Sequence, residues 1–76
     1  MIILKELVEL VAKTIAGGVE FAAMKTLVQD MESQDLSGAE KREKVLEDFK
    51  QIGYELAGWT VNALLELAII WIRAAL

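Results

Sequence analysis

A chain of 76 residues is long enough for one domain, which we expect to span residues 1–76. Histidine and cysteine are both absent, which excludes imidazole bases, disulfides and thiolate metal sites. The net charge is -4, and the 8 basic residues are dispersed among 12 acids, which excludes the basic stripe of a nucleic-acid-binding protein.

Apolar residues make up 55% of the chain, above the about 45–50% that is typical of soluble domains. A monomer of this size buries only about 60% of the surface that its unfolded chain exposes. The surplus apolar surface must therefore meet another surface. We expect a homo-oligomer whose open apolar face lies on residues 56–72.

Apolar residues at three- and four-residue spacing predict a first helix from about residue 3 to about residue 32. Gly17 and Gly18 interrupt this pattern, and each glycine weakens a helix by about 1 kcal/mol relative to alanine. Gly18 and Ala22 stack on the apolar face, so we expect them to allow a close helix crossing that offsets this loss. A kink at the glycines is the alternative.

Residues 33–37 form the predicted loop, and the helix that follows has a well-marked start. Ser37 and Glu40 have the spacing of a capping box. In this arrangement the Ser37 hydroxyl accepts from the Glu40 amide, while the Glu40 carboxylate accepts from the Ser37 amide. The pair predicts that a helix begins at about Gly38, and its expected function is structural.

The second helix is predicted to continue to about residue 75, because its narrow apolar line runs past Gly53 and no good N-cap residue follows that glycine. A break at Gly53 is the alternative. The expected fold is therefore all-α: a helical hairpin of two long helices, or three helices if Gly53 ends one. Copies of this unit are expected to assemble as a homo-oligomeric helical bundle.

Residues 56–72 are nearly all apolar, but one polar stripe runs along them. At 100° per residue its polar members fall within about 40° of one another, with a tryptophan beside them. The stripe consists of Glu55, Trp59, Asn62, Glu66 and Arg73. It is interpreted as a solvent-facing edge, as a polar seam that fixes the register between subunits, or as the wet face of a membrane helix.

The two tryptophans invite different interpretations. Trp71 lies on the apolar side and is expected in the core. Trp59 borders the polar stripe, so half-buried packing is expected there, with a partner contact as the alternative. Together with Glu55, Trp59 is our candidate for an external contact.

No set of residues supports catalysis or the binding of a metal or cofactor. Counted from Asp30, the calcium-loop positions that require glycine and glutamate hold Asp35 and Lys41. The paired glycines lie within a predicted helix and are not followed by the Lys-Ser/Thr of a phosphate loop. We therefore expect no enzyme activity and no cofactor.

Two stretches resemble the C-terminal region of the LL-H-type phage holins. They are Ser37-Gly38-x-Glu40-Lys41 running to Val45-Leu46, and Val61-Asn62-Ala63-Leu64-Leu65-Glu66-x-Ala68-Ile69. The resemblance covers about residues 37–69 and implies a phage or prophage origin and a membrane-active lysis function. Members of that family carry an apolar membrane helix near the N-terminus, whereas residues 1–24 here carry five charges.

These observations favour a non-enzymatic phage or prophage accessory protein, a homo-oligomer that binds a host macromolecule such as a protein. A holin-like lysis protein is one alternative, and a helical oligomer that cages a small ligand is another. The charges between Lys5 and Lys13 interrupt any targeting segment. The expected location is therefore the cytoplasm, with the inner membrane as the alternative.

Overall fold

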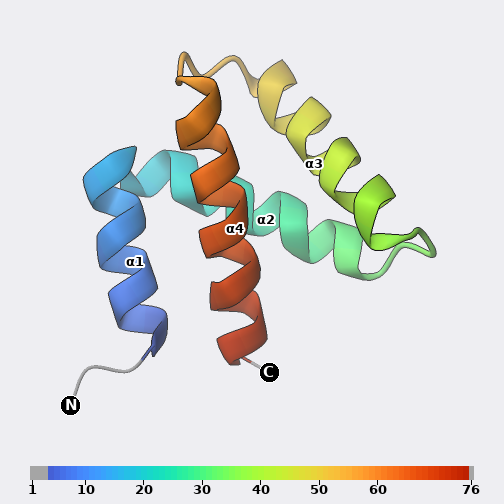
Figure 1. The fold of residues 1–76 in the computed structure, drawn as a ribbon, viewed down its shortest axis with the longest axis horizontal. Coiled ribbons are helices and arrows are strands. Elements are labelled where there is room, and N and C mark those ends of the chain that lie inside the picture. The colour runs from blue at the N-terminus through green and yellow to red at the C-terminus, as the bar shows by residue number, and fades with distance from the viewer. Residues whose placement is uncertain (1–3, 76) are drawn as a thin grey trace.

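The computed structural model describes residues 4–75, in which four α-helices pack together (Figure 1). Residue 3, where the first helix was predicted to begin, lies outside the described residues. The helices are α1 (Leu4–Ile15), α2 (Gly18–Glu32), α3 (Gly38–Ile52) and α4 (Gly58–Ala75). The prediction of an all-α fold is confirmed, but each of the two long predicted helices is divided into two.

The first division lies at Gly17, so the prediction of one helix over residues 3–32 is wrong. Gly17 has φ 140° and ψ 159°, a backbone conformation that glycine adopts and L side chains avoid. A Cβ atom at this position would also collide with the Glu20 carboxylate. The chain therefore leaves α1 after Ile15 and begins α2 in a new direction (Figure 1).

The second division lies at Gly53, so the continuous helix over residues 38–75 is also wrong and its stated alternative is right. Gly53 has φ 95° and ψ 14°, the left-handed conformation of a helix C-cap, and its N–H donates to the Lys50 carbonyl. Helix α4 then begins with no side-chain signal. The Ala57 carbonyl accepts from the amides of Thr60 and Val61 at 3.0 and 3.1 Å.

Both hydrogen bonds of the predicted capping box are present at the start of α3. The Glu40 amide donates to the Ser37 hydroxyl at 3.2 Å, and the Ser37 amide donates to the Glu40 carboxylate at 3.3 Å. The box satisfies amides that the first helical turn leaves unpaired. It fixes the end of the connection between α2 and α3.

Helix α4 lies at the centre of the bundle (Figure 1) and packs against α1, α2 and α3. Helix α3 packs mainly on α2, and α1 packs on α4 and α2. The core contains side chains from all four helices: Val8, Ala12, Phe21, Met24, Val28, Met31, Val45, Phe49, Leu64, Leu65, Ala68 and Ile72. Each large side chain buried in this way stabilises the fold by about 1.5–3 kcal/mol.

The predicted close crossing at Gly18 and Ala22 is wrong, because both residues are exposed. A Cβ atom at Gly18 would meet only the Lys13 side chain, at 3.6 Å. Since Gly17 interrupts the helix, α2 has its own rotational setting and does not continue the apolar face of α1. It buries the face of Phe21 and Met24 instead.

Candidate functional site

Helix α1 turns a row of large apolar side chains toward solvent. The row, which we term the α1 apolar face, consists of Leu4, Leu7, Leu10 and Val11, which are 54%, 47%, 61% and 41% exposed. The buried side of the same helix presents Val8 and Ala12, with the partly buried Ile15 packed against the core. Within residues 4–75 this face of α1 is therefore unpartnered, although surplus apolar surface was predicted on residues 56–72.

One edge of the α1 apolar face carries two opposite charges. At 100° per residue, Glu6 and Lys13 lie within about 20° of each other and beside Leu10. Both side chains are exposed, and they lie two helical turns apart. Lys13 also approaches the Glu9 carboxylate of its own helix at 3.5 Å.

The polar side of α1 is attached to the neighbouring helices by a mixed polar and aromatic cluster. Lys25 of α2 forms an ion pair with Glu9, and its ammonium lies 4.2 Å from the centroid of the Trp71 ring on α4. Lys5 lies over the same ring at 4.3 Å. The hydrogen bond from Lys25 holds the pKa of Glu9 below its usual value. Trp71, expected in the core, is only partly buried and packs against it.

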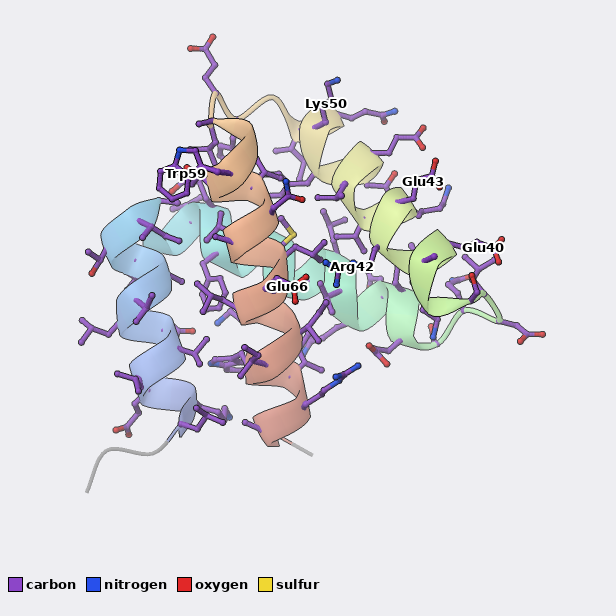
Figure 2. The ribbon with its side chains drawn as sticks, in the orientation of Figure 1. Glu40, Arg42, Glu43, Lys50, Trp59 and Glu66 are labelled. Atoms are coloured by element: carbon purple, nitrogen blue, oxygen red, sulfur yellow. The ribbon has the colours of Figure 1, made fainter. Side chains whose placement is uncertain are left out.

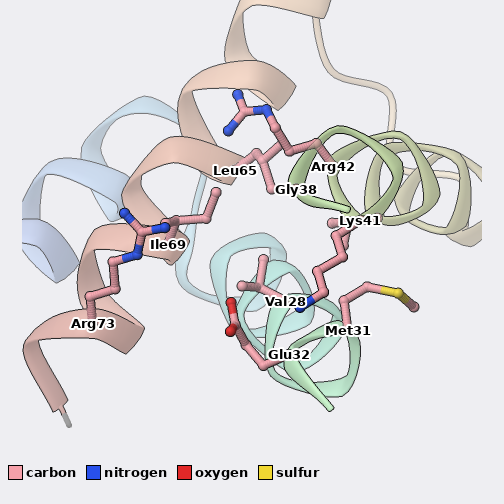
Figure 3. A pocket seen from close by; sticks show the side chains of 10 residues that line it. Val28, Met31, Glu32, Gly38, Lys41, Arg42, Leu65, Ile69 and Arg73 are labelled. Atoms are coloured by element: carbon pink, nitrogen blue, oxygen red, sulfur yellow. The ribbon is translucent and has the colours of Figure 1, made fainter. Parts of the chain in front are cut away.

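A pocket of about 220 Å³ lies between α2, α3 and α4 on another part of the surface (Figure 3). Its residues combine an apolar wall with charged groups; we term it the α2–α3–α4 pocket. It is lined by Val28, Met31, Glu32, Gly38, Lys41, Arg42, Val45, Leu65, Ile69 and Arg73. Three cationic side chains thus surround an apolar hollow on a protein whose net charge is -4.

An ion pair joins α3 to α4 beside this pocket. The Arg42 guanidinium donates to the Glu66 carboxylate across the gap between the two helices (Figure 2). The two side chains are 45% and 53% exposed. Water therefore screens the pair, and its contribution to the stability of the fold is small.

The polar stripe predicted along α4 is only partly assembled. Asn62, Glu66 and Arg73 are all exposed on α4, and the Asn62 amide donates to the Gly58 carbonyl at 3.0 Å. Glu55 is exposed but lies in the connection before α4, because the break at Gly53 removes it from the helix. Within a single chain the stripe is a solvent-facing edge.

Trp59 projects from the first turn of α4 (Figure 2) and is 67% exposed, so half-buried packing is wrong. Lys41 and Arg42 were not predicted as site residues. Their one sequence signal is that they follow the capping box directly. Their convergence with Arg73 depends on how α3 and α4 pack, and the position of two residues after a capping box does not reveal that packing.

Other classes of site find no support in the described part of the chain. Among residues 4–75, no group of three or more histidine, cysteine, aspartate or glutamate residues could hold a metal ion. No helix within the same range is both long and apolar enough to cross a membrane. Every buried side-chain nitrogen or oxygen in these residues has a hydrogen-bond partner.

Comparisons of the chain with protein-family models, with curated proteins and with solved structures find no match.

Proposed function

We propose that this chain is a non-enzymatic interaction protein that pairs with a second copy of itself through the α1 apolar face. The observation that carries the proposal is the exposure of Leu4, Leu7, Leu10 and Val11, between 41% and 61%, along one side of one helix. Contiguous apolar patches rimmed by polar residues are characteristic of protein–protein contacts. Scattered apolar exposure would need no partner.

The charges beside the face support a second copy as the occupant. When the two-fold axis is perpendicular to the paired helices, the two copies of α1 run antiparallel, so the same edge of each helix meets its counterpart in reverse order. Glu6 of one copy then faces Lys13 of the other, and the pair forms twice. Opposite charges at such flanking positions set the orientation of paired helices.

The size of the face sets the expected strength of the dimer. Helix α1 has 12 residues and is therefore about 18 Å long. One helix of this length offers less than the about 800 Å² per partner of a standard interface. We therefore expect a dimer that dissociates on dilution.

Sedimentation over a concentration series, without detergent, tests the proposal. Val11→Gln should shift the protein to the monomer, whereas Ile70→Gln should leave the dimer intact. Ile70 lies on α4 and is exposed to the same 41% as Val11, so the two variants remove similar apolar area. A monomer of 8.4 kDa at millimolar concentration, or equal loss of dimer in both variants, would overturn the proposal.

A charge exchange tests the antiparallel arrangement separately. Glu6→Lys should weaken the dimer, because the new lysine would face Lys13 of the other copy. Combining it with Lys13→Glu should restore the dimer, since opposite charges at positions 6 and 13 again face each other across the contact. Loss of the dimer in the double variant as well would contradict the antiparallel pairing.

A second contact, with a host protein, is our wider proposal. The resemblance of residues 37–69 to phage holins favours a phage or prophage accessory protein, and Trp59 offers a large aromatic side chain that is 67% exposed. Tryptophan is enriched among the residues that dominate binding energies. Pull-down from host lysate with the native protein and with Trp59→Ala, read by mass spectrometry, should reveal a protein retained only by the native chain. Identical sets of retained proteins would contradict this contact.

A further inference from the structure

The α2–α3–α4 pocket lies outside the face proposed for self-association, and its chemistry specifies a ligand. We propose that it binds a small monocarboxylate whose apolar body enters the hollow while its carboxylate meets Lys41 and Arg73. The two cations lie on different helices, α3 and α4, on either side of the apolar wall (Figure 3). The inference does not rest on the dimer.

The volume of the pocket limits the apolar part of the ligand. An apolar cavity of about 150 Å³ in another protein accommodates benzene, so a pocket of about 220 Å³ has room for about nine non-hydrogen atoms. Val28, Leu65 and Ile69 supply apolar contacts from α2 and α4. A single aromatic ring or a short alkyl chain matches this space.

The charges around the pocket favour one negative charge on the ligand. Lys41, Arg42 and Arg73 provide three positive charges, and Glu32 lines the same pocket. Glu66 pairs with Arg42, so two carboxylates oppose the three cations and leave one positive charge unbalanced. A monocarboxylate balances it, whereas a phosphate dianion would leave one negative charge in excess.

Phenylacetate is the probe, because it joins one ring to one carboxylate. Titration followed by the amide NMR signals of Gly38 and Ile69 should give saturable shifts with a dissociation constant of about 1 mM, as expected for about ten non-hydrogen atoms. Phenylacetamide, which keeps the ring without the charge, should bind at least fivefold more weakly. Acetate, which keeps the charge without the ring, should give no saturable shift.

A matched pair of double variants isolates the charges of the pocket. Lys41→Gln with Arg73→Gln should weaken phenylacetate binding at least fivefold. Lys44→Gln with Lys50→Gln should leave it unchanged, although it removes the same net charge from exposed positions of α3. Equal binding by both double variants, equal binding of phenylacetamide, or no saturation up to 20 mM phenylacetate, about 20 times the expected constant, would each overturn the proposal.

Val11→Gln separates this inference from the proposed dimer. The variant changes the α1 apolar face and leaves the pocket residues intact, so phenylacetate should bind to it as to the native protein. Loss of the dimer with unchanged phenylacetate binding supports both proposals. Loss of phenylacetate binding in Val11→Gln would place the ligand on α1 and overturn the pocket proposal.

Discussion

Helices α1 and α4 are both rich in apolar residues, yet they differ in how many of these residues they bury. Helix α4 buries Leu64, Leu65, Ala68 and Ile72 and leaves a polar stripe exposed. Helix α1 fully buries only Val8 and Ala12 and leaves its three leucines and Val11 exposed. The more apolar helix is thus the better covered of the two.

The difference follows from the number of neighbours. Helix α4 is surrounded by α1, α2 and α3, whereas α1 packs on α4 and α2 alone. Val8, Ala12 and Ile15 on the inner side of α1 contact the bundle. Among residues 4–75, no side chain covers the leucines on its outer side, which remain about half exposed. Apolar composition therefore indicates that surplus surface exists, but the packing decides which helix carries it.

Truncation of one leucine in each helix gives the largest expected contrast. Leu65→Ala should destabilise the fold by about 2–5 kcal/mol, because it removes a fully buried side chain and leaves a cavity. Leu10→Ala, at a side chain that is 61% exposed, should change the free energy of unfolding by less than about 0.5 kcal/mol. Urea denaturation at a concentration where the protein is monomeric measures both. Similar losses in the two variants would contradict the comparison.

A smaller effect is expected at the capping box, which belongs to neither helix. Ser37→Ala should lower the free energy of unfolding by about 1 kcal/mol, since the Glu40 amide loses its acceptor. Dimer formation and phenylacetate binding should be unchanged once the protein is folded. Loss of partner binding at unchanged thermal stability would show that Ser37 has a direct function in recognition.

The capping box also shows how far local sequence signals reach. Ser37 and Glu40 are three residues apart and form their hydrogen bonds without help from the rest of the fold, so their pattern was sufficient. Gly17 and Gly53 interrupt the helices through backbone conformations with positive φ. No side chain beside either glycine forms a local pattern that predicts these conformations. Because a kink at Gly17 and a break at Gly53 were only the alternatives, the rotational setting of α2 and the position of Glu55 were not predicted.

The α1 apolar face and the α2–α3–α4 pocket are harder to predict from a sequence pattern than the capping box. The periodicity of α1 correctly separates its apolar and polar sides, but it does not say which apolar residues face the bundle and which remain exposed. The α2–α3–α4 pocket needs Lys41 of α3 and Arg73 of α4 to converge, and these residues are 32 positions apart. Such convergence is a property of the packed helices.

The attachment of α1 can be tested through its pH dependence. Because the hydrogen bond from Lys25 lowers the pKa of Glu9 below its ordinary value of 4.5, the ionised carboxylate stabilises the fold above that pH. This contribution should be lost as the pH falls below 4.5 and through the pKa of the folded state. The stability difference between native protein and Glu9→Gln should shrink in that range, while Glu43→Gln, at an exposed acid of α3, serves as the control. A difference that is constant with pH would contradict this coupling.

The smallest expected change in stability lies on the polar stripe of α4. Glu66→Ala removes a side chain that is 53% exposed from an ion pair with Arg42, so the free energy of unfolding should change by less than about 0.5 kcal/mol. The same change leaves Arg42 without its carboxylate and adds a positive charge beside the α2–α3–α4 pocket. Phenylacetate should therefore bind at least about twofold more tightly to the variant. The expected gain is modest because water screens charges near a surface.

Denaturation and NMR titration of the same Glu66→Ala sample separate the interpretations of the stripe. A stability loss of about 1–3 kcal/mol together with an altered oligomer would identify Glu66 as part of a buried seam between subunits, since its removal would then strand a polar partner. Unchanged stability with tighter phenylacetate binding would mean that the carboxylate competes with the ligand for Arg42. Helix α4 would then differ from α1 in function as well as in burial: its exposed edge would tune a binding pocket, while the α1 apolar face would hold the second copy that we propose.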